Sequence, residues 1–144
     1  MTLHQISVFV ENKPGKLQQL TDVLAKNNVN MRALSLAEAS EFGIVRIIVE
    51  DTQAAAKVLT AADYIYTVSN VVGIAIPDEP GGLNHVLAIL SDAGINVEYM
   101  YAVLGGKNIT GAYMIFYVQD TEIAVSILAA HNITCISQSD LLNK

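Results

Sequence analysis

Two short segments of this sequence have the composition of an anion-binding turn. They are Glu11-Asn-Lys-Pro-Gly-Lys-Leu17 and Pro77-Asp-Glu-Pro-Gly-Gly-Leu83, and each follows a strand-like segment and precedes a helix-like one. Proline suits the first position of a helix, and the glycine after it lets a ligand approach the backbone closely. The first amides of a helix have no intrahelical partner and carry a partial positive charge. The pattern therefore predicts a site for an anionic group such as a carboxylate.

The same turn is also an ordinary way to begin a helix, with no ligand involved. Its occurrence twice favours binding, and so does the asparagine that follows each predicted helix, Asn30 in one case and Asn96 in the other.

The charges of the two turns differ. The first contains Lys13 and Lys16, whereas the second contains Asp78 and Glu79. Two carboxylates beside a ligand carboxylate repel it by about 1 kcal/mol each, and one helix dipole offers only about the same in return. We therefore expect a carboxylate to bind the amides from Gly15 to Leu17. Asp78 is expected to cap its own helix or to attract an ammonium at a second site.

An internal repeat sets the architecture. A shift of 66 positions superposes Ile6–Val10 on Val72–Ile76 and aligns both Pro-Gly turns, and a shift of 69 aligns the segments after residue 49 with those after residue 118. The chain is thus a duplicated unit of about 70 residues, with expected domains 1–70 and 71–144.

Each copy has the same predicted order of strand, helix, strand, strand, helix, strand. In the first copy these elements are expected at 6–10, 14–28, 30–38, 44–50, 52–62 and 64–69. In the second copy they are expected at 72–76, 80–93, 96–104, 112–118, 121–130 and 133–137, with a turn at Gly105–Asn108. This predicts an α+β fold of two ferredoxin-like βαββαβ units packed together, with antiparallel sheets and helices on one face.

The repeated turn and its surroundings resemble the ACT domain. The motif is Asn12-Lys-Pro-Gly-Lys-Leu17 with Asn28-Val-Asn30, and again Asp78-Glu-Pro-Gly-Gly-Leu83 with Gly94-Ile-Asn96. The resemblance covers the whole chain as two ACT units. It implies a regulatory protein that binds a free amino acid and acts on a partner enzyme or transporter of amino-acid metabolism. A ligand-independent assembly subunit of such an enzyme is the alternative.

The resemblance also implies which residues hold the ligand. Serine-sensing ACT units use an asparagine two residues before the proline and another at the start of the second strand, here Asn12 and Asn30. They also use a histidine at the position of Val10, so serine specificity is not implied. The second copy has Asp78, Asn96 and, in place of the histidine, Ile76. The ligand of such units lies between two units, which here are the two repeats or two chains. The expected ligand-binding residues are Asn12, Lys13, Pro14, Gly15, Lys16, Leu17, Asn30, Met31, Asp78, Glu79, Pro80, Gly81, Gly82, Leu83, Asn96 and Val97.

Catalytic and metal chemistry find little support in the sequence. His4, His85 and His131 are scattered without metal-ligand spacing, and no nucleophile–base pair is apparent. His131 suits a helix C-terminus, while His85, one turn beyond the second Pro-Gly, either faces solvent or touches a ligand. Cys135, the one cysteine, lies in an apolar context and is expected to be a buried thiol. We expect no enzyme, no cofactor and no metal.

Composition bounds the partners. With 8 Lys and Arg against 14 Asp and Glu, the net charge is −6, which argues against a nucleic-acid partner. No apolar stretch is long enough to span a membrane, and one cysteine fits the reducing cytoplasm. Strand alternation leaves six residues on the sheet faces turned away from the helices, namely Ile44, Arg46, Ile48, Tyr113, Ile115 and Tyr117. These apolar faces, in a chain that is 52% apolar, predict a homodimer or a larger oligomer.

Overall fold

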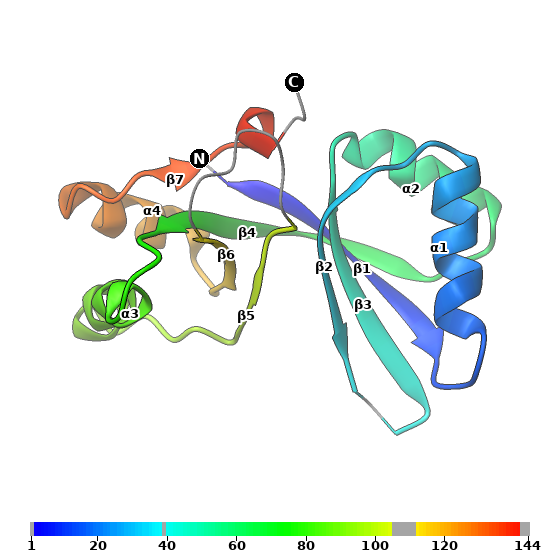
Figure 1. Cartoon of the computed structure of the whole chain (residues 1–144), viewed down its shortest axis with the longest axis horizontal. Coiled ribbons are helices and arrows are strands. Elements are labelled where there is room, and N and C mark those ends of the chain that lie inside the picture. The colour runs from blue at the N-terminus through cyan, green and yellow to red at the C-terminus, as the bar shows by residue number, and fades with distance from the viewer. Residues whose placement is uncertain (1, 39, 105–111, 142–144) are drawn as a thin grey trace. The chain divides into compact units, whose positions relative to one another are not determined.

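The computed structural model of the chain describes residues 2–38, 40–104 and 112–141, which divide into two compact units (Figure 1). The first unit is His4–Ser69. The second unit contains the described residues from Asn70 onward together with Thr2 and Leu3, the first residue of β1. Both units combine helices with antiparallel strands, so the predicted α+β class is confirmed.

The first unit contains β1 (Leu3–Glu11), α1 (Lys16–Lys26), β2 (Met31–Ala37), β3 (Phe42–Val49), α2 (Thr52–Ala61) and the first part of β4 (Tyr66–Ile76). Its strands lie in the order β2-β3-β1-β4, with β3 antiparallel to both β1 and β2. In Figure 1, α1 and α2 pack on one side of these strands. This is the predicted ferredoxin-like unit, in which β2 is an edge strand.

The second unit repeats this arrangement. It uses the second part of β4, then α3 (Gly82–Asp92), β5 (Tyr99–Ala102), β6 (Ala112–Tyr117), α4 (Thr121–Ala130) and β7 (Cys135–Ile136). β4 pairs with both β6 and β7, and β6 pairs with β5, so β4 has the position that β1 has in the first unit. A short 3₁₀ helix at Gln138–Leu141 was not expected from the sequence. The predicted turn at Gly105–Asn108 lies outside the described residues.

Strand alternation places the apolar core between sheet and helices. In the first unit the helix-facing side chains of β1 and β3 are buried together with Leu20 and Leu24 of α1 and Leu59 of α2. In the second unit Phe116 of β6, Val118 just after it and residues of β4 pack against α3 and α4 in the same way. Each core holds the first helix of its unit, and with it the Pro-Gly turn, against the end of the sheet.

The Pro-Gly turns differ from the prediction in where the helices begin. The prolines were expected at the first helical position, but α1 begins at Lys16 and α3 at Gly82. The N-cap residues are Gly15 and Gly81, with φ angles of 84° and 87°. This left-handed conformation is costly for other residues, which explains why glycine follows each proline.

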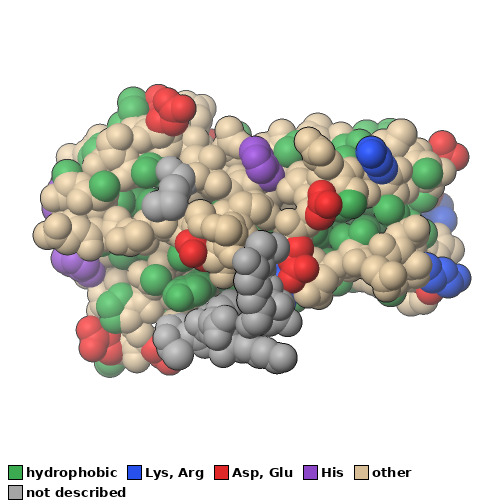
Figure 2. Space-filling model, turned by 90° about the horizontal axis from the view of Figure 1, so that it is seen from above, with side chains coloured by type: hydrophobic (Ala, Val, Ile, Leu, Met, Phe, Trp, Pro, Cys, Tyr) green, Lys and Arg blue, Asp and Glu red, His purple; other side chains and the backbone are tan. Residues whose placement is uncertain are grey.

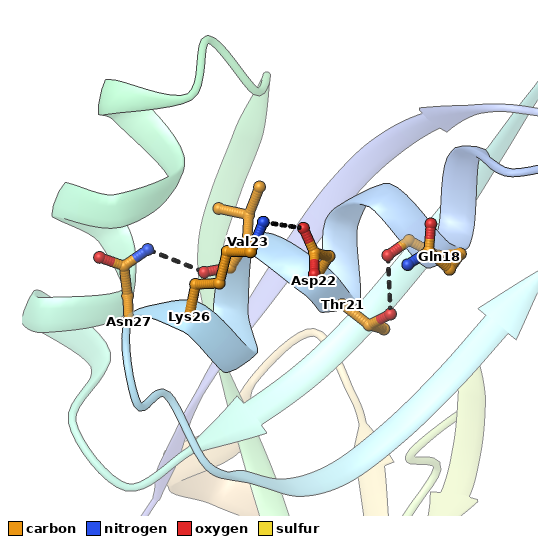
Figure 3. A network of polar contacts seen from close by, with 6 residues as sticks. All are labelled: Gln18, Thr21, Asp22, Val23, Lys26 and Asn27. Atoms are coloured by element: carbon orange, nitrogen blue, oxygen red, sulfur yellow. Dashed lines mark hydrogen bonds and ion pairs between the residues drawn. The ribbon is translucent and has the colours of Figure 1, made fainter.

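The solvent side of α1 is held by contacts along the helix itself (Figure 3). Lys26 Nζ lies 2.9 Å from Asp22 Oδ2, one turn away, and Thr21 Oγ1 donates a hydrogen bond to the carbonyl of Gln18. Asn27, the C-cap, donates from its side chain to the carbonyl of Val23 at 2.8 Å. The helix therefore ends at Lys26 with Asn27 as its C-cap, close to the predicted end at residue 28.

The outer sheet faces, from which the sequence predicts a dimer, are only partly buried: Arg46, Tyr113 and Tyr117 on them are half-buried. Ile48 of β3 and Ile115 of β6 lie on the predicted faces, but both are fully buried within the single chain. Ile44 is half-buried. Oligomerisation stays a prediction.

Candidate functional site

The first Pro-Gly turn is anchored to the beginning of β3. The amide of Asn12 donates to the carbonyl of Glu41 at 2.9 Å, which ties the end of β1 to the residue before β3. Within the turn the amide of Lys16 donates to the carbonyl of Lys13 at 3.2 Å, and the amide of Gln19 donates to the carbonyl of Gly15 at 3.0 Å. The turn therefore has a fixed shape before any ligand arrives.

Two amides at this turn are available to a ligand. Among the described residues, no acceptor is found for the backbone N–H groups of Leu17 and Gln18, which follow the N-cap glycine. The Gly15 N-cap has no side chain that could satisfy them. N–H groups of this kind, at the positive end of a helix, are suited to donate hydrogen bonds to an anion.

A pocket of about 390 Å³ adjoins these amides. It is lined by Val10, Glu11, Asn12, Lys13, Pro14, Leu17, Leu36 and Gly43. The volume is at the lower end of the range of about 300–1,000 Å³ found for small-molecule sites. Four of the predicted site residues thus line one pocket, and all of its lining residues belong to the first unit.

The charged groups of the pocket are arranged around Glu11. Lys13 Nζ lies 3.1 Å from Glu11 Oε2, and Lys16 lines a neighbouring pocket that shares Val10 and Glu11. The hydrogen bond from Lys13, with the charges of Lys13 and Lys16, lowers the pKa of Glu11 from its ordinary value. Lys13 is thus already paired with Glu11. Lys16 and Glu11 still place a positive and a negative charge near the turn, which suits a zwitterionic ligand.

The pair of asparagines is not brought together within the first unit. Asn12 bonds to the residue before β3, whereas the side chain of Asn30 donates to Glu50 Oε1, after the end of β3, at 3.4 Å. The eight residues of β3 span about 26 Å at 3.3 Å per residue. Met31 lies beside Asn30, paired with Val49. No single amino acid can therefore contact both Asn12 and Asn30 of one unit.

The second unit shows the same separation. Asn96 and Val97 lie beyond the end of α3 and line a pocket of about 430 Å³, while Pro80 and Gly81 precede its beginning. The 11 residues of α3 extend about 16 Å. Asn96 also lines a second pocket of about 450 Å³ with Glu98 and Asp120.

The turn of the second unit differs from the first in two respects. Asp78 does not cap the helix as expected, because the N-cap of α3 is Gly81 and carries no side-chain hydrogen bond. Gly82 is buried, and a Cβ at that position would collide with the carbonyl oxygen of Pro77, where the first unit has the side chain of Lys16. Asp78, Glu79 and Pro80 are all exposed. The second turn is therefore tighter and more acidic than the first.

Two histidines and the cysteine considered from the sequence lie at a helix end, on a helix surface and in the core. His131 is the C-cap of α4, and its Nδ1 lies 2.9 Å from the carbonyl of Ile127, as expected for a helix end. His85 is exposed on α3. Cys135 is buried, and burial raises the pKa of its thiol. In residues 2–38, 40–104 and 112–141, no three His, Cys, Asp or Glu side chains gather as a metal site would require.

Charge is distributed unevenly between the units. Residues 1–70 contain 6 of the 8 basic residues, and the Lys and Arg side chains visible in Figure 2 gather over the first unit, on the right. No helix among the described residues has the length and apolar character needed to cross a membrane.

Two residues of the pocket, Leu36 and Gly43, were not predicted from the sequence. They come from β2 and β3, and only the strand register brings them beside Val10 and the turn. A comparison of the two copies of the repeat singles out these two positions, because their residue types differ there. Leu36 aligns with Ala102 and Gly43 with Ala112, so the copies differ where the pocket forms.

Comparisons with known proteins agree with this fold. The family model of the ACT domain pair matches residues 1–144. The crystal structure of protein BT0572 from Bacteroides thetaiotaomicron superposes with a TM-score of 0.89 at 38% identity, covering 98% of this chain and 96% of that one. The regulatory subunit of aspartate kinase from Thermus thermophilus, in its ligand-free form, shares the fold with a TM-score of 0.65 at 14% identity, covering 90% of this chain and 91% of that one. The regulatory subunit from Thermus flavus does so with a TM-score of 0.64 at 15% identity, covering 92% of each chain. No curated protein matches the chain. With a family match along its whole length and two ferredoxin-like units in succession, this chain belongs to the ACT domain pair family.

Proposed function

We propose that this protein binds a free amino acid and, in response, regulates a partner enzyme or transporter of amino-acid metabolism. The observation that carries the proposal is the pocket of about 390 Å³ beside the unpaired amides of Leu17 and Gln18. The fold shared with the regulatory subunits of aspartate kinase supports a regulatory role. The chain acts through binding and has no catalytic activity of its own.

The ligand binds at the turn of the first unit. Its carboxylate accepts hydrogen bonds from the amides of Leu17 and Gln18, with Asn12 orienting it, and its ammonium lies near Glu11. At the second turn Asp78 and Glu79 would repel a carboxylate. The first turn is therefore the primary site, and the second remains a candidate for the ammonium of another ligand.

A second copy of the chain completes the site. Asn30 is too far from Asn12 within one unit, so a second asparagine reaches this ligand only from another unit. Leu36 and Phe42 are more than half exposed at the pocket end of the first unit, next to the edge strand β2. A homodimer that covers these side chains brings a second unit to the pocket. Light scattering at micromolar concentration should show at least twice the 15.5 kDa chain mass; a clean monomer would contradict this.

The test of the proposal is a titration. Isothermal calorimetry of the whole chain against each of the twenty amino acids should give saturable heat with at least one, together with a rise in Tm that grows with ligand concentration. The absence of both heat and thermal shift for all twenty would overturn the proposal.

The exposed apolar side chains also favour a second candidate, a subunit that assembles with an enzyme without any ligand. Phe9, Phe42 and Ile65 line one shallow pocket, and Ile65 is 73% exposed. A surface of this kind suits contact with another protein. Recovery of an enzyme in a pull-down to the same extent with and without amino acids would favour this candidate.

A further inference from the structure

Gly43 lines the pocket of the first unit at a position of β3 that has no side chain. Gly43 pairs with Val10 across β3 and β1, on the side of the sheet that faces the helices. Two and four residues further along β3, Val45 and Ile47 fill the corresponding space and are almost completely buried. Gly43 is also buried, and the end of the Leu36 side chain lies beside it, where a Cβ on Gly43 would begin.

The walls of this pocket are apolar. Val10, Pro14, Leu17 and Leu36 line it together with Gly43, whereas the charged and polar side chains of the pocket belong to residues 11–13 of the turn. Val10 is 7% exposed, while Leu36 is 57% exposed at the rim. The pocket thus combines an apolar interior with a polar edge, which suits a molecule that has one charged end and one apolar end.

We propose that this pocket takes the side chain of an aliphatic α-amino acid and that Gly43 sets the size of side chain it admits. The inference rests on the proposed function, in which the turn binds the carboxylate and ammonium of the same molecule. With those groups at the turn, the side chain extends between Val10 and Leu36 toward Gly43. Burial of its methylenes supplies binding free energy.

A polar side chain is disfavoured in the same place. The side chains of Val10, Pro14 and Leu17 offer no hydrogen-bonding group to a ligand hydroxyl. A buried hydroxyl without a partner loses its hydrogen bonds to water. Serine and threonine should therefore bind more weakly than 2-aminobutyrate and valine, which have the same sizes.

The second unit does not share this pocket. Ile76 pairs with Ala112 as Val10 pairs with Gly43, so a methyl group stands where the first unit has none. Ala102 replaces Leu36 and removes the apolar rim. The two units therefore provide a matched comparison within one chain.

The test measures affinity along a series of unbranched amino acids. Calorimetry of the whole chain with alanine, 2-aminobutyrate and norvaline should show an affinity gain of about fourfold per added methylene. Gly43→Ala should remove most of this gain while changing the affinity for alanine little. The new Cβ would lie 3.1 Å from Leu36 Cδ1, the end of an exposed side chain that can move, so the fold should tolerate it.

Two further variants keep the result interpretable. Ala112→Gly makes the matched change in the second unit and should leave the series unchanged. Leu36→Ala should weaken norvaline by about fourfold or more relative to alanine, and it carries the test if Gly43→Ala does not fold. Because the proposed dimer also covers Leu36, light scattering checks that this variant keeps the oligomeric state of the unaltered chain.

The failures of the two proposals are distinguishable. If amino acids bind but affinity does not rise along the series, or if serine binds more tightly than 2-aminobutyrate, the aliphatic pocket is wrong and the proposed function stands. An effect of Ala112→Gly in place of Gly43→Ala would also overturn the assignment. If no amino acid binds the unaltered chain, both proposals are wrong.

Discussion

Gly15 and Gly81 have nearly the same backbone conformation, with φ and ψ of 84° and −12° at one and 87° and −5° at the other. A Cβ built at either position meets no atom within 4 Å. Any side chain placed there is therefore strained by the backbone alone and to the same extent in both units. These two glycines form a matched pair in which differences in function are separable from differences in stability.

The first prediction concerns that strain. Gly15→Ala and Gly81→Ala should each destabilise the unit that contains the change by about 1–2 kcal/mol, because an L-residue with positive φ is disfavoured. Urea unfolding followed by circular dichroism measures this. A loss at one position with none at the other would show that the two turns are not equivalent in conformation.

The second prediction concerns the ion pair at the pocket. Lys13 lowers the pKa of Glu11 through a hydrogen bond and its charge, so Lys13→Ala should raise that pKa toward its ordinary value of 4.5. In the unaltered chain the stabilisation from this pair is present above pH 4.5 and is lost as pH falls through the lowered pKa. NMR titration of the Glu11 carboxyl carbon measures the pKa of Glu11 in the unaltered chain and in Lys13→Ala. An unchanged pKa in Lys13→Ala would show that the contact is absent in solution.

The third prediction concerns the buried thiol. Because burial of Cys135 raises its thiol pKa above 9.0, the reactive thiolate is scarce at pH 8. Labelling by a thiol reagent at pH 8 should be slow for the folded chain and immediate in denaturant. The contribution of the buried neutral thiol to the free energy of unfolding is fully present below pH 9.0. It is lost as the pH rises through the raised pKa of the folded state. Rapid labelling of the folded chain would contradict this burial.

The repeat explains why so much of the fold was predictable. Ile6, Val8 and Val10 alternate as strand residues do, and the same pattern recurs at Val72, Ile74 and Ile76. Two independent copies of one pattern confirm each other, so the element order follows without a structure.

The beginning of the helices was predicted wrongly for a physical reason. Proline at the first helical position and glycine at a left-handed N-cap both fit the letters Pro-Gly. Which of these two helix beginnings forms depends on the φ angle of Gly15, and the residue types alone do not reveal that angle. The sequence predicts the amides from Gly15 to Leu17 as hydrogen-bond donors to a ligand. In the structure no acceptor among the described residues is found for the amides of Leu17 and Gln18.

The pocket was only half predictable. Asn12, Lys13, Pro14 and Leu17 are adjacent in sequence, so a motif identifies them. Leu36 and Gly43 reach the pocket through the register of β2 and β3 with β1, and their long-range position follows from the folded sheet. The separation of Asn12 from Asn30 likewise became evident only when β3 was placed between them.

The most direct test of the central claim compares Gly15→Asp with Gly81→Asp by calorimetry, using an amino acid that binds the unaltered chain. Equal thermal melting of the two variants, expected from their matched backbone, would confirm that both fold alike. Gly15→Asp places a carboxylate beside the amides of Leu17 and Gln18 and should abolish binding at the first turn, whereas Gly81→Asp should retain it. Loss of binding in Gly81→Asp with retention in Gly15→Asp would contradict the account.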